Sequence, residues 1–222
     1  MSEKTDKERK FVIDTSVFTN PNSRKSFGKT TVEAVKNFLK FAAKTPFIHF
    51  YMPLSIKKEL TTFLGEDVPF LESVLIVKSP SLYELNVPAA VVYKFIDEIR
   101  NRIDKGLRLS EKMLRNYKPE EIDQRIHDLR EKYRSALREG VIDSKEDFDV
   151  VMLAKEVGGI IVTADYGLMK MAEWLGLSFF KAERFHEFLI YVSNKQAVFS
   201  EDYTHFLEEQ LDNCLLYTSP SP

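Results

Sequence analysis

The sequence has very little of what several protein classes require. Its 222 residues include one cysteine, Cys214, so no internal disulfide can form and a disulfide-stabilised secreted fold is excluded. No apolar run approaches the roughly 18 residues of a membrane-spanning helix. The charged N-terminus MSEKTDKERK lacks the apolar segment of an export signal. Together with 44% hydrophobic and 30% charged residues, this predicts a soluble, cytoplasmic protein without membrane association.

The sequence motifs of several enzyme classes are also missing. Neither G-x-x-x-x-G-K-[ST] nor G-x-G-x-x-G occurs, so nucleotide hydrolysis and dinucleotide redox chemistry lack their phosphate-binding loops. No Ser/His/Asp or Cys/His set is evident, because the four histidines are scattered: His49, His127, His186 and His205. We therefore look to the acidic residues for chemistry.

The formal charge of −2 gives no overall reason to expect a nucleic-acid partner, but the charge is unevenly distributed. The segment from Ile99 to Arg138 holds twelve Lys or Arg and seven Asp or Glu, a net charge of +5 that leaves −7 for the rest. A basic segment of this kind is a candidate surface for phosphate groups.

Hydrophobic patterning predicts strands that alternate with helices. Such alternation, with strands that are apolar on both faces, indicates an α/β fold with a parallel sheet flanked by helices. The segment from Thr15 to Asn22 is rich in turn-forming residues and is predicted to be a loop. The predicted strands are 10–14, 47–52, 75–78, 159–162 and 177–180, and the predicted helices are 31–44, 54–64, 147–157 and 167–175.

Two long amphipathic helices are predicted before the fourth strand. Their apolar residues recur close to heptad spacing from Val91 to Ile103 and from Ile122 to Leu137, and Pro119 suits the first turn of the second helix. This hairpin could close over the core, or it could project and serve self-association, RNA contact or both. We predict a discontinuous domain, 10–90 with 140–213, and an inserted basic helical hairpin, 91–139.

The last nine residues, 214–222, read CLLYTSPSP. They resemble the translation of a sequencing adapter, so we expect them to lie outside the fold.

Three aspartates are predicted to meet at the edge of the sheet where parallel strands end. Asp14 ends the first strand, Asp165 follows the fourth, and Asp147 begins the helix that leads into the fourth. Ser16 and Thr163 lie beside two of them. Clustered carboxylates repel one another unless a cation neutralises them, and hard oxygen ligands suit Mg²⁺ or Mn²⁺. A lone aspartate is more often a helix cap, so the convergence of three carries the prediction.

Three segments resemble the acidic motifs of PIN-domain nucleases, in the order of that family. They are FVIDTSVFTN at the start, PLSIKKEL in the second helix, and DFDVVMLAKEVGGIIVTAD near the end. The resemblance spans about Lys10 to Ala182. It implies a metal site built from Asp14, Glu59, Asp147 and Asp165, with Thr163 as the hydroxyl before the last aspartate.

A narrower resemblance comes from the basic hairpin and from IDSKEDFD, where Asp143, Asp147 and Asp149 crowd together. Both features are similar to the minimal protein-only, or RNA-free, ribonuclease P of archaea and some bacteria. That resemblance implies a catalytic set of Asp14, Asp143, Asp147 and Asp165, precursor tRNA as the substrate, and a homo-oligomer formed through the hairpin.

The chemistry expected from such a site is hydrolysis of a phosphodiester by water, assisted by divalent cations. Two alternatives remain open: another PIN endoribonuclease, toxin-like or rRNA-processing, and a catalytically silent PIN scaffold that binds RNA. If the helix begins before Asp147, Asp143 lies one turn earlier on the same face, whereas Asp149 points away from Asp147. The arginines available for RNA phosphates are Arg108, Arg115, Arg125, Arg130 and Arg134.

Overall fold

The computed structural model describes residues 9–45, 47–65, 71–115, 122–138 and 144–194. The chain divides into two compact units, one formed by Met1–Leu85 with Ser144–Pro222 and the other by Asn86–Asp143. Asp143, Pro119 and the adapter-like segment 214–222 lie outside the described residues. The expectations that concern them therefore stay predictions.

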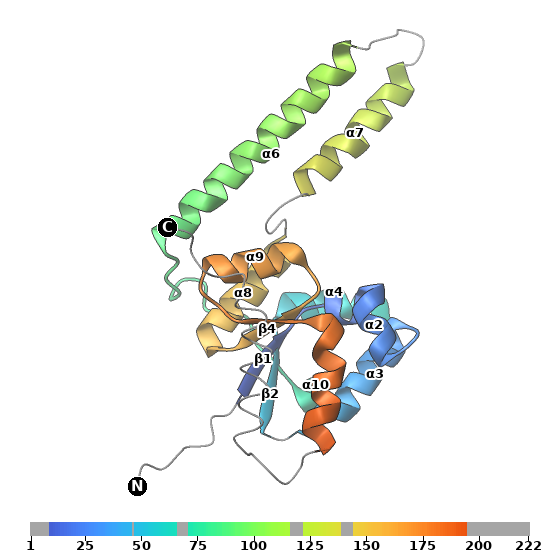
Figure 1. Cartoon of the computed structure of the whole chain (residues 1–222), viewed down its shortest axis with the longest axis vertical. Helices are drawn as coiled ribbons and strands as arrows, with labels where there is room; N and C mark the ends of the chain where they lie inside the picture. The colour runs from blue at the N-terminus through green and yellow to red at the C-terminus, as the bar shows by residue number, and fades with distance from the viewer. Residues whose placement is uncertain (1–8, 46, 66–70, 116–121, 139–143, 195–222) are drawn as a thin grey trace. The chain divides into compact units, whose positions relative to one another are not determined.

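The first unit is built on a five-stranded parallel sheet (Figure 1), which confirms the predicted α/β class. Its strand order is β3-β2-β1-β4-β5, and every neighbouring pair is parallel. The polypeptide builds outward from β1 to β2 and β3 on one side and later adds β4 and β5 on the other. The strands are β1 (Arg9–Ile13), β2 (Ile48–Met52), β3 (Leu75–Val77), β4 (Ile160–Thr163) and β5 (Phe179–Lys181).

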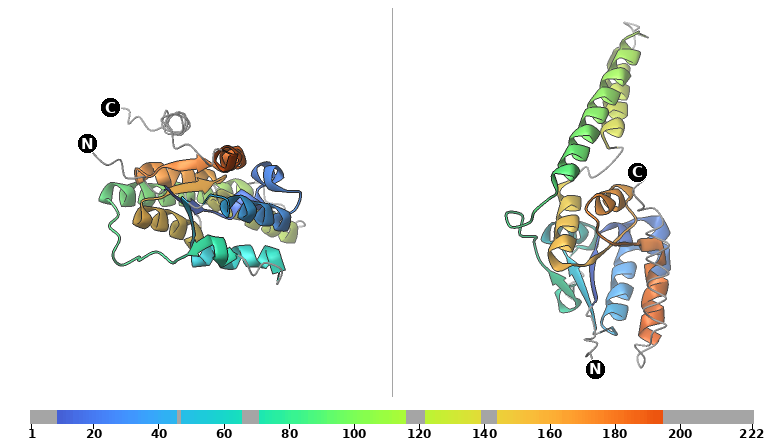
Figure 2. Two further views of the ribbon diagram at one scale, coloured as in Figure 1. Left: turned by 90° about the horizontal axis from the view of Figure 1, so that it is seen from below. Right: turned by 60° about the vertical axis from the view of Figure 1, so that its left-hand side comes forward.

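Helices cover both faces of the sheet (Figure 2). The helices of this unit are α1 (Ser16–Thr19), α2 (Pro21–Phe27), α3 (Thr31–Ala42), α4 (Leu54–Leu64), α5 (Leu71–Val74), α8 (Lys145–Val157), α9 (Tyr166–Trp174) and α10 (Ala182–Asn194). α3 and α10 lie on one face, and α8 lies on the other, where it contacts β1, β4, α4 and α9.

An aromatic cluster fills the core between the sheet and α3 with α10. The Phe11 ring of β1 lies 5.5 Å from Phe185 and 5.4 Å from Phe188 of α10, measured between ring centroids. The Phe38 ring of α3 lies 5.3 Å from Phe50 of β2. All five side chains are buried. Because side chains alternate along a strand, Val12 and Asp14 leave β1 on the opposite face, toward α8.

The segment after β1 is helical, so the prediction of a loop from Thr15 to Asn22 was wrong. α1 and α2 follow β1 directly. The Asn20 side chain accepts a hydrogen bond from the Asn22 amide at 2.9 Å, and Pro21 occupies the first turn of α2. Asn20 therefore caps a helix and Pro21 begins it, which are uses of the residue types that also form turns.

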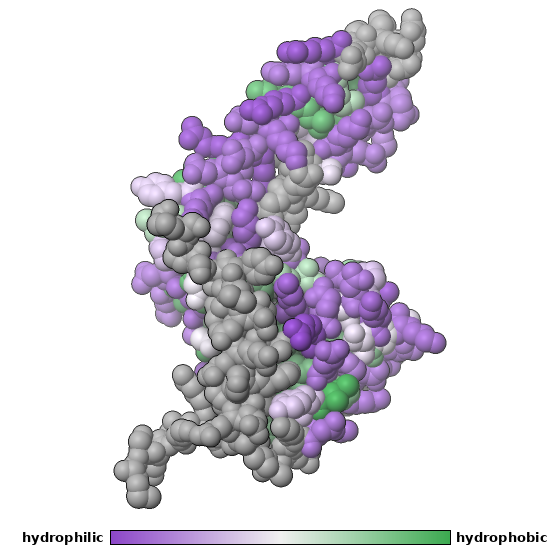
Figure 3. Space-filling model, viewed as in Figure 1, coloured by the Kyte–Doolittle hydropathy of each residue, from purple (hydrophilic) through white to green (hydrophobic). Residues whose placement is uncertain are grey.

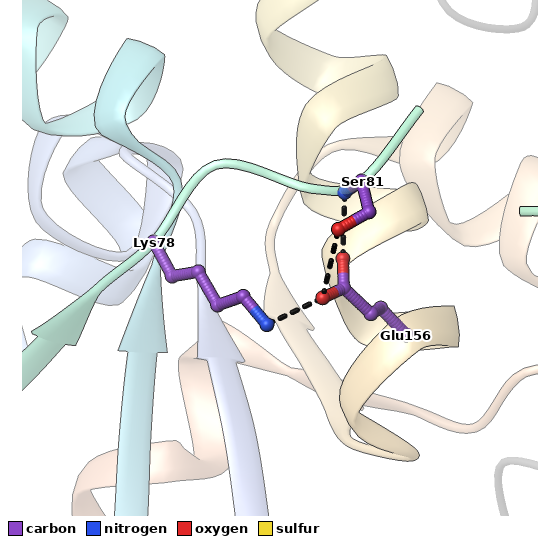
Figure 4. A network of polar contacts seen from close by, with 3 residues as sticks. All are labelled: Lys78, Ser81 and Glu156. Carbon is purple, nitrogen blue, oxygen red and sulfur yellow. Dashed lines mark hydrogen bonds and ion pairs between the residues drawn. The ribbon is translucent and has the colours of Figure 1, made fainter. Parts of the chain in front are cut away.

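A polar contact ties the connection after β3 to α8 (Figure 4). The Glu156 carboxylate of α8 pairs with the Lys78 ammonium and accepts a 2.7 Å hydrogen bond from the Ser81 amide. The hydrogen bond from Lys78 lowers the pKa of Glu156. Glu156 thus holds the chain close to α8 as it leaves the edge strand.

The second unit contains α6 (Ala89–Arg115) and α7 (Ile122–Arg138), which pack along each other and confirm the predicted helical hairpin. Gly106 of α6 is buried under the Tyr133 ring, and a Cβ atom at that position would lie 2.6 Å from the ring. Ile122 and Ile126 are 45% and 40% exposed, so they are not buried against the partner helix within this unit. Figure 3 shows apolar patches within the largely hydrophilic surface of this unit.

Among the helices that the structure describes, none combines the length and apolarity needed to cross a lipid bilayer.

Candidate active site

The candidate site lies where β1 and β4 end side by side. Here the direction of chain progression through the sheet reverses, which is the place where open α/β sheets bind ligands. Ile13 pairs in register with Val162, and the Asp14 amide donates to the Val162 carbonyl at 3.1 Å. This pairing brings the residue after β1, Asp14, next to the last residue of β4, Thr163.

One carboxylate oxygen of Asp14 accepts three hydrogen bonds. Oδ2 accepts from the Thr163 hydroxyl at 2.8 Å, from the Ser16 amide at 3.3 Å, and from the Ser16 hydroxyl. Asp14 is only 3% exposed. Ser16 thus contacts the neighbouring Asp14, whereas Thr163, expected beside Asp165, donates its proton to Asp14.

Backbone amides of the segment after β4 orient these two hydroxyls. The Ala164 amide donates to Ser16 Oγ at 2.8 Å, and the Asp165 amide donates to Thr163 Oγ1 at 2.9 Å. Each hydroxyl oxygen accepts from an amide and has its proton available for Asp14 Oδ2, and the two hydroxyl oxygens lie 3.1 Å apart. The end of β4 thus fixes the orientation of a carboxylate that belongs to β1.

The other oxygen of Asp14 has a weaker contact. Thr15 Oγ1 lies 3.4 Å from Asp14 Oδ1 and 3.3 Å from Oε2 of Glu59, which α4 supplies. Both distances are long for an O–H···O bond, and one proton cannot serve both acceptors. Asp14 Oδ1 is therefore the better placed of the two oxygens to bind a cation.

The electrostatics of Asp14 and Glu59 favour the binding of a cation. Burial raises the pKa of Asp14, and the charge of Asp165 raises it further, against the lowering effect of Ser16 and Thr163. Burial also raises the pKa of Glu59, with additional contributions from the charges of Asp14 and Glu146. A cation would offset the repulsion that raises both values.

Asp165 is exposed and occupies the N-cap of α9, where its Oδ1 accepts from the Leu168 amide at 2.8 Å. Capping uses one oxygen and leaves the other for a ligand. Asp165 therefore both caps α9 and interacts electrostatically with Asp14.

Asp147 lies in the first turn of α8 and is partly exposed. The N-cap of this helix is Ser144, whose Oγ accepts from the Asp147 amide at 3.0 Å. Ser144, and not Asp147, therefore caps the start of α8. Glu146, the residue before it, was not among the predicted site residues, although its charge acts on Glu59.

Asp149 has a structural contact. Its Oδ2 accepts a 2.6 Å hydrogen bond from the Ser55 hydroxyl of α4, which links α8 to α4. Sequence patterning gave no signal for this pair, because it depends on how two helices pack.

The donor set suits a hard cation, because the side chains around Asp14 offer oxygen atoms and no sulfur or imidazole nitrogen. Within the described residues, however, no three His, Cys, Asp or Glu side chains are spaced to hold one metal ion. The charge of Asp165 raises the pKa of Asp14, and the charge of Asp14 raises the pKa of Glu59. The shared metal set that includes Asp147 remains a prediction.

Comparison with known proteins places this geometry in context. Residues 10–193 match the family described as PINc domain ribonuclease. The RNA-free ribonuclease P of Pyrococcus furiosus is 46% identical over 183 residues, which cover 81% of this chain and 92% of that protein. The RNA-free ribonuclease P of Thermodesulfovibrio yellowstonii is 42% identical over 189 residues, which cover 83% and 95%. That of Haloarcula marismortui is 39% identical over 200 residues, which cover 80% and 88%.

Proposed function

The chain belongs to the RNA-free ribonuclease P family of PINc domain ribonucleases, and from this premise we propose that it removes the 5′ leader of precursor tRNA by metal-dependent hydrolysis. The observation that carries the chemistry is the buried Asp14 carboxylate between β1 and β4. One of its oxygens is held by three donors, and the other lies near the Thr15 hydroxyl, which is also 3.3 Å from Oε2 of Glu59.

We assign the divalent cation, Mg²⁺ or Mn²⁺, to Asp14, Glu59, Asp147 and Asp165. When bound, such an ion neutralises the carboxylates, activates water and offsets charge on the phosphodiester. Ser16 and Thr163 hold Asp14 Oδ2, so Oδ1 stays in a fixed direction. Asp165 contributes its charge at the start of α9, where α-helical backbone amides also favour a phosphate.

Asp143, which lies outside the described residues, completes the proposed catalytic set of Asp14, Asp143, Asp147 and Asp165. We propose that it orients the attacking water or holds a second cation.

The hairpin is proposed to bind the folded body of precursor tRNA and to join copies of the chain into a homo-oligomer. Arg108 and Arg115 of α6 and Arg130 and Arg134 of α7 are exposed, and Arg125 is partly exposed. Guanidinium groups at such positions can reach phosphates. The exposed isoleucines of the same helices supply apolar surface for another copy.

The decisive experiment incubates the full chain with precursor tRNA and Mg²⁺ and maps the cut by sequencing both product ends. We expect one cut that yields the mature 5′ end, and no cut after chelation with EDTA. A cut at other positions or in other RNAs would indicate a different PIN endoribonuclease. Tight RNA binding without any cut in Mg²⁺ or Mn²⁺ would indicate a silent scaffold.

A further inference from the structure

The first turn of α9 presents an aromatic side chain directly beside the candidate active site. Tyr166 follows Asp165 and is 72% exposed. The capping bond from the Leu168 amide to Asp165 fixes where this helix begins, and therefore where Tyr166 stands. A tyrosine ring this exposed adds little to the core, so its position at the site calls for a role in binding.

Two further residues share its helix face. Lys170 and Trp174 follow Tyr166 at intervals of four residues, the spacing that aligns side chains along one side of a helix. The Lys170 ammonium lies 5.5 Å from the centre of the Trp174 ring, a cation–π contact that holds the charge along the helix. We call Tyr166, Lys170 and Trp174 the α9 strip.

Another lysine lies on the same side of the site. Lys181 is the last residue of β5, is exposed, and pairs in register with Thr163. Register partners in a parallel sheet project from the same face, so Lys181 leaves the sheet on the face of Asp14 and Thr163. Lys170 and Lys181 therefore belong to the elements that follow β4, α9 and β5, whereas Glu59 and Glu146 belong to α4 and α8.

We propose that the α9 strip binds the single-stranded 5′ leader of the substrate, with Tyr166 stacked on an unpaired base beside the scissile phosphate. Lys170 contacts a leader phosphate, and Trp174 positions Lys170. This inference rests on the proposed function. On the mature side of the cut, the bases are stacked inside the acceptor stem and cannot reach a side chain. The leader offers free base faces and phosphates, which aromatic and cationic side chains bind together.

Binding assays test the stacking role. In the full chain carrying Asp14→Asn to prevent cleavage, affinities are measured for precursor tRNA with a leader and for leaderless tRNA. We expect Tyr166→Ala to weaken binding of the leader-bearing RNA about fivefold or more and to leave the leaderless RNA unaffected. Tyr166→Phe keeps the ring and should bind as the parent does. Tyr83→Ala is the matched control, because Tyr83 is fully exposed after β3, two strands from β1.

The charge of Lys170 has its own test. Each phosphate contact on a single strand contributes about 0.7 to the slope of log affinity against log salt. We expect Lys170→Ala to reduce that slope by about 0.7 for the leader-bearing RNA only. Lys44→Ala is the control, since Lys44 is exposed and precedes β2, at the opposite edge of the sheet.

Trp174 supplies a direct signal, because it is the only tryptophan in the chain. A single-stranded RNA oligonucleotide of leader sequence should change the fluorescence emission of Trp174. In the Lys170→Ala variant, this change should require a higher RNA concentration.

Equal weakening of leader-bearing and leaderless RNA by Tyr166→Ala, or no weakening of either, would overturn the assignment. So would a Trp174 emission that leader RNA leaves unchanged. Failure of the unmodified chain to cleave precursor tRNA would instead contradict the proposed function, which these binding measurements do not require.

Discussion

At the scale of single residues, the two oxygens of Asp14 differ because their neighbours differ. Oδ2 is saturated by Ser16 and Thr163, whereas Oδ1 has only the long contact from Thr15. An asparagine could place its carbonyl oxygen at Oδ2 and its amide group at Oδ1, near the Thr15 hydroxyl. Asp14→Asn therefore preserves the local hydrogen bonds while it removes the charge.

We expect Asp14→Asn to lose at least about 100-fold in cleavage rate under saturating Mg²⁺, because charge stabilisation of this kind contributes several kcal/mol. Asp165→Asn and Asp147→Asn should behave alike. Single-turnover kinetics measure the loss. A variant that keeps a tenth of the parent rate would rule out that residue as a ligand of the essential cation.

The same substitution should not destabilise the metal-free protein at neutral pH. The pKa of Asp14 is raised above its ordinary 3.8, so the folded state binds the proton more tightly than the unfolded state. Stability is therefore lost as pH rises from about 3.8 through the folded pKa, and Asn avoids that loss. Urea unfolding in EDTA at pH 7 should give Asp14→Asn a midpoint equal to or above that of the parent.

Asp149 and Asp143 should differ in their effects. Asp149 accepts from Ser55, so Asp149→Asn should retain cleavage and cost about 1 kcal/mol or less of stability, with Ser55→Ala giving a similar loss. Asp143→Asn should instead abolish cleavage. Paired measurements of rate and urea midpoint check this. A larger rate loss from Asp149→Asn than from Asp143→Asn would reverse the assignment.

Several site residues could be predicted from the sequence because they stand at strand ends. Thr163 ends β4, and Asp14, Ser16 and Asp165 follow β1 or β4. Parallel strands end at one edge of the sheet, so these residues meet there. The contact from Thr15 to Glu59 and the charge of Glu146 could not be predicted. They depend on how α4 and α8 rotate about their axes when they pack, which no local pattern encodes.

At the scale of elements, the strands and most of the longer helices were predictable, whereas the short helices and α10 were not. β1 and α3 carry clear periodicity, and α3 begins with a capping box between Thr30 and Glu33. α1 has four residues and no side-chain cap, so nothing local distinguishes it from a turn. α10 was not predicted, although its phenylalanines complete the core beneath β1.

The contact of α10 with α2 and α3 includes a titratable group. His186 lies edge-on to Phe27 at 4.8 Å and to Phe41 at 5.2 Å, between ring centroids. Burial lowers the pKa of His186 below its ordinary 6.5, against a small opposing effect of Glu187. The unfolded chain therefore takes up a proton before the folded chain does as pH falls below about 6.5, so stability is lost in that direction.

We expect His186→Phe to reduce the loss of stability between pH 8 and pH 5.5. Urea midpoints of parent and variant are compared at both values. The imidazole is neutral at pH 8, so the difference in urea midpoint between parent and variant at pH 8 reports the change in packing alone. The change in this difference between pH 8 and pH 5.5 reports the proton uptake by His186. Parallel curves for the two proteins would show that His186 does not contribute to the acid sensitivity.

At the scale of the whole molecule, the chain divides its residue types between two units. The carboxylates lie in the α/β unit, and most of the basic excess lies on α6 and α7. The sequence revealed this division through charge and heptad spacing. It did not reveal which apolar residues face the partner helix. One partner helix covers only part of a near-heptad stripe, and Ile122 and Ile126 stay exposed.

The exposed stripe leads to a prediction about assembly. Ile126 is 40% exposed within one chain, so Ile126→Asp should leave the hairpin folded and reduce particle mass in light scattering. Ser135→Asp, on an exposed position of the same helix, is the control. Tyr133 is unsuitable because it covers Gly106, and its loss would loosen the hairpin itself. Unchanged mass for Ile126→Asp would exclude this stripe from the interface.

The arginines of the hairpin lead to a prediction that separates binding from chemistry. Each phosphate contact adds about 0.7 to 0.9 to the salt dependence of affinity, because counterions leave the RNA. Reversing Arg108, Arg115 and Arg125 to Glu should weaken precursor tRNA binding and flatten its salt dependence. Cleavage of a short unstructured RNA should stay unchanged, because it requires only the carboxylate site.

A control with the same change in net charge reverses Lys36, Lys40 and Lys44, which are exposed on and just after α3. If both triple reversals weaken tRNA binding equally, the total charge of the protein governs affinity and the hairpin has no special role. If only the hairpin variant loses affinity while its cut in short RNA persists, the two units have separate tasks: α6 and α7 hold the folded RNA, and the edge of the sheet cuts it.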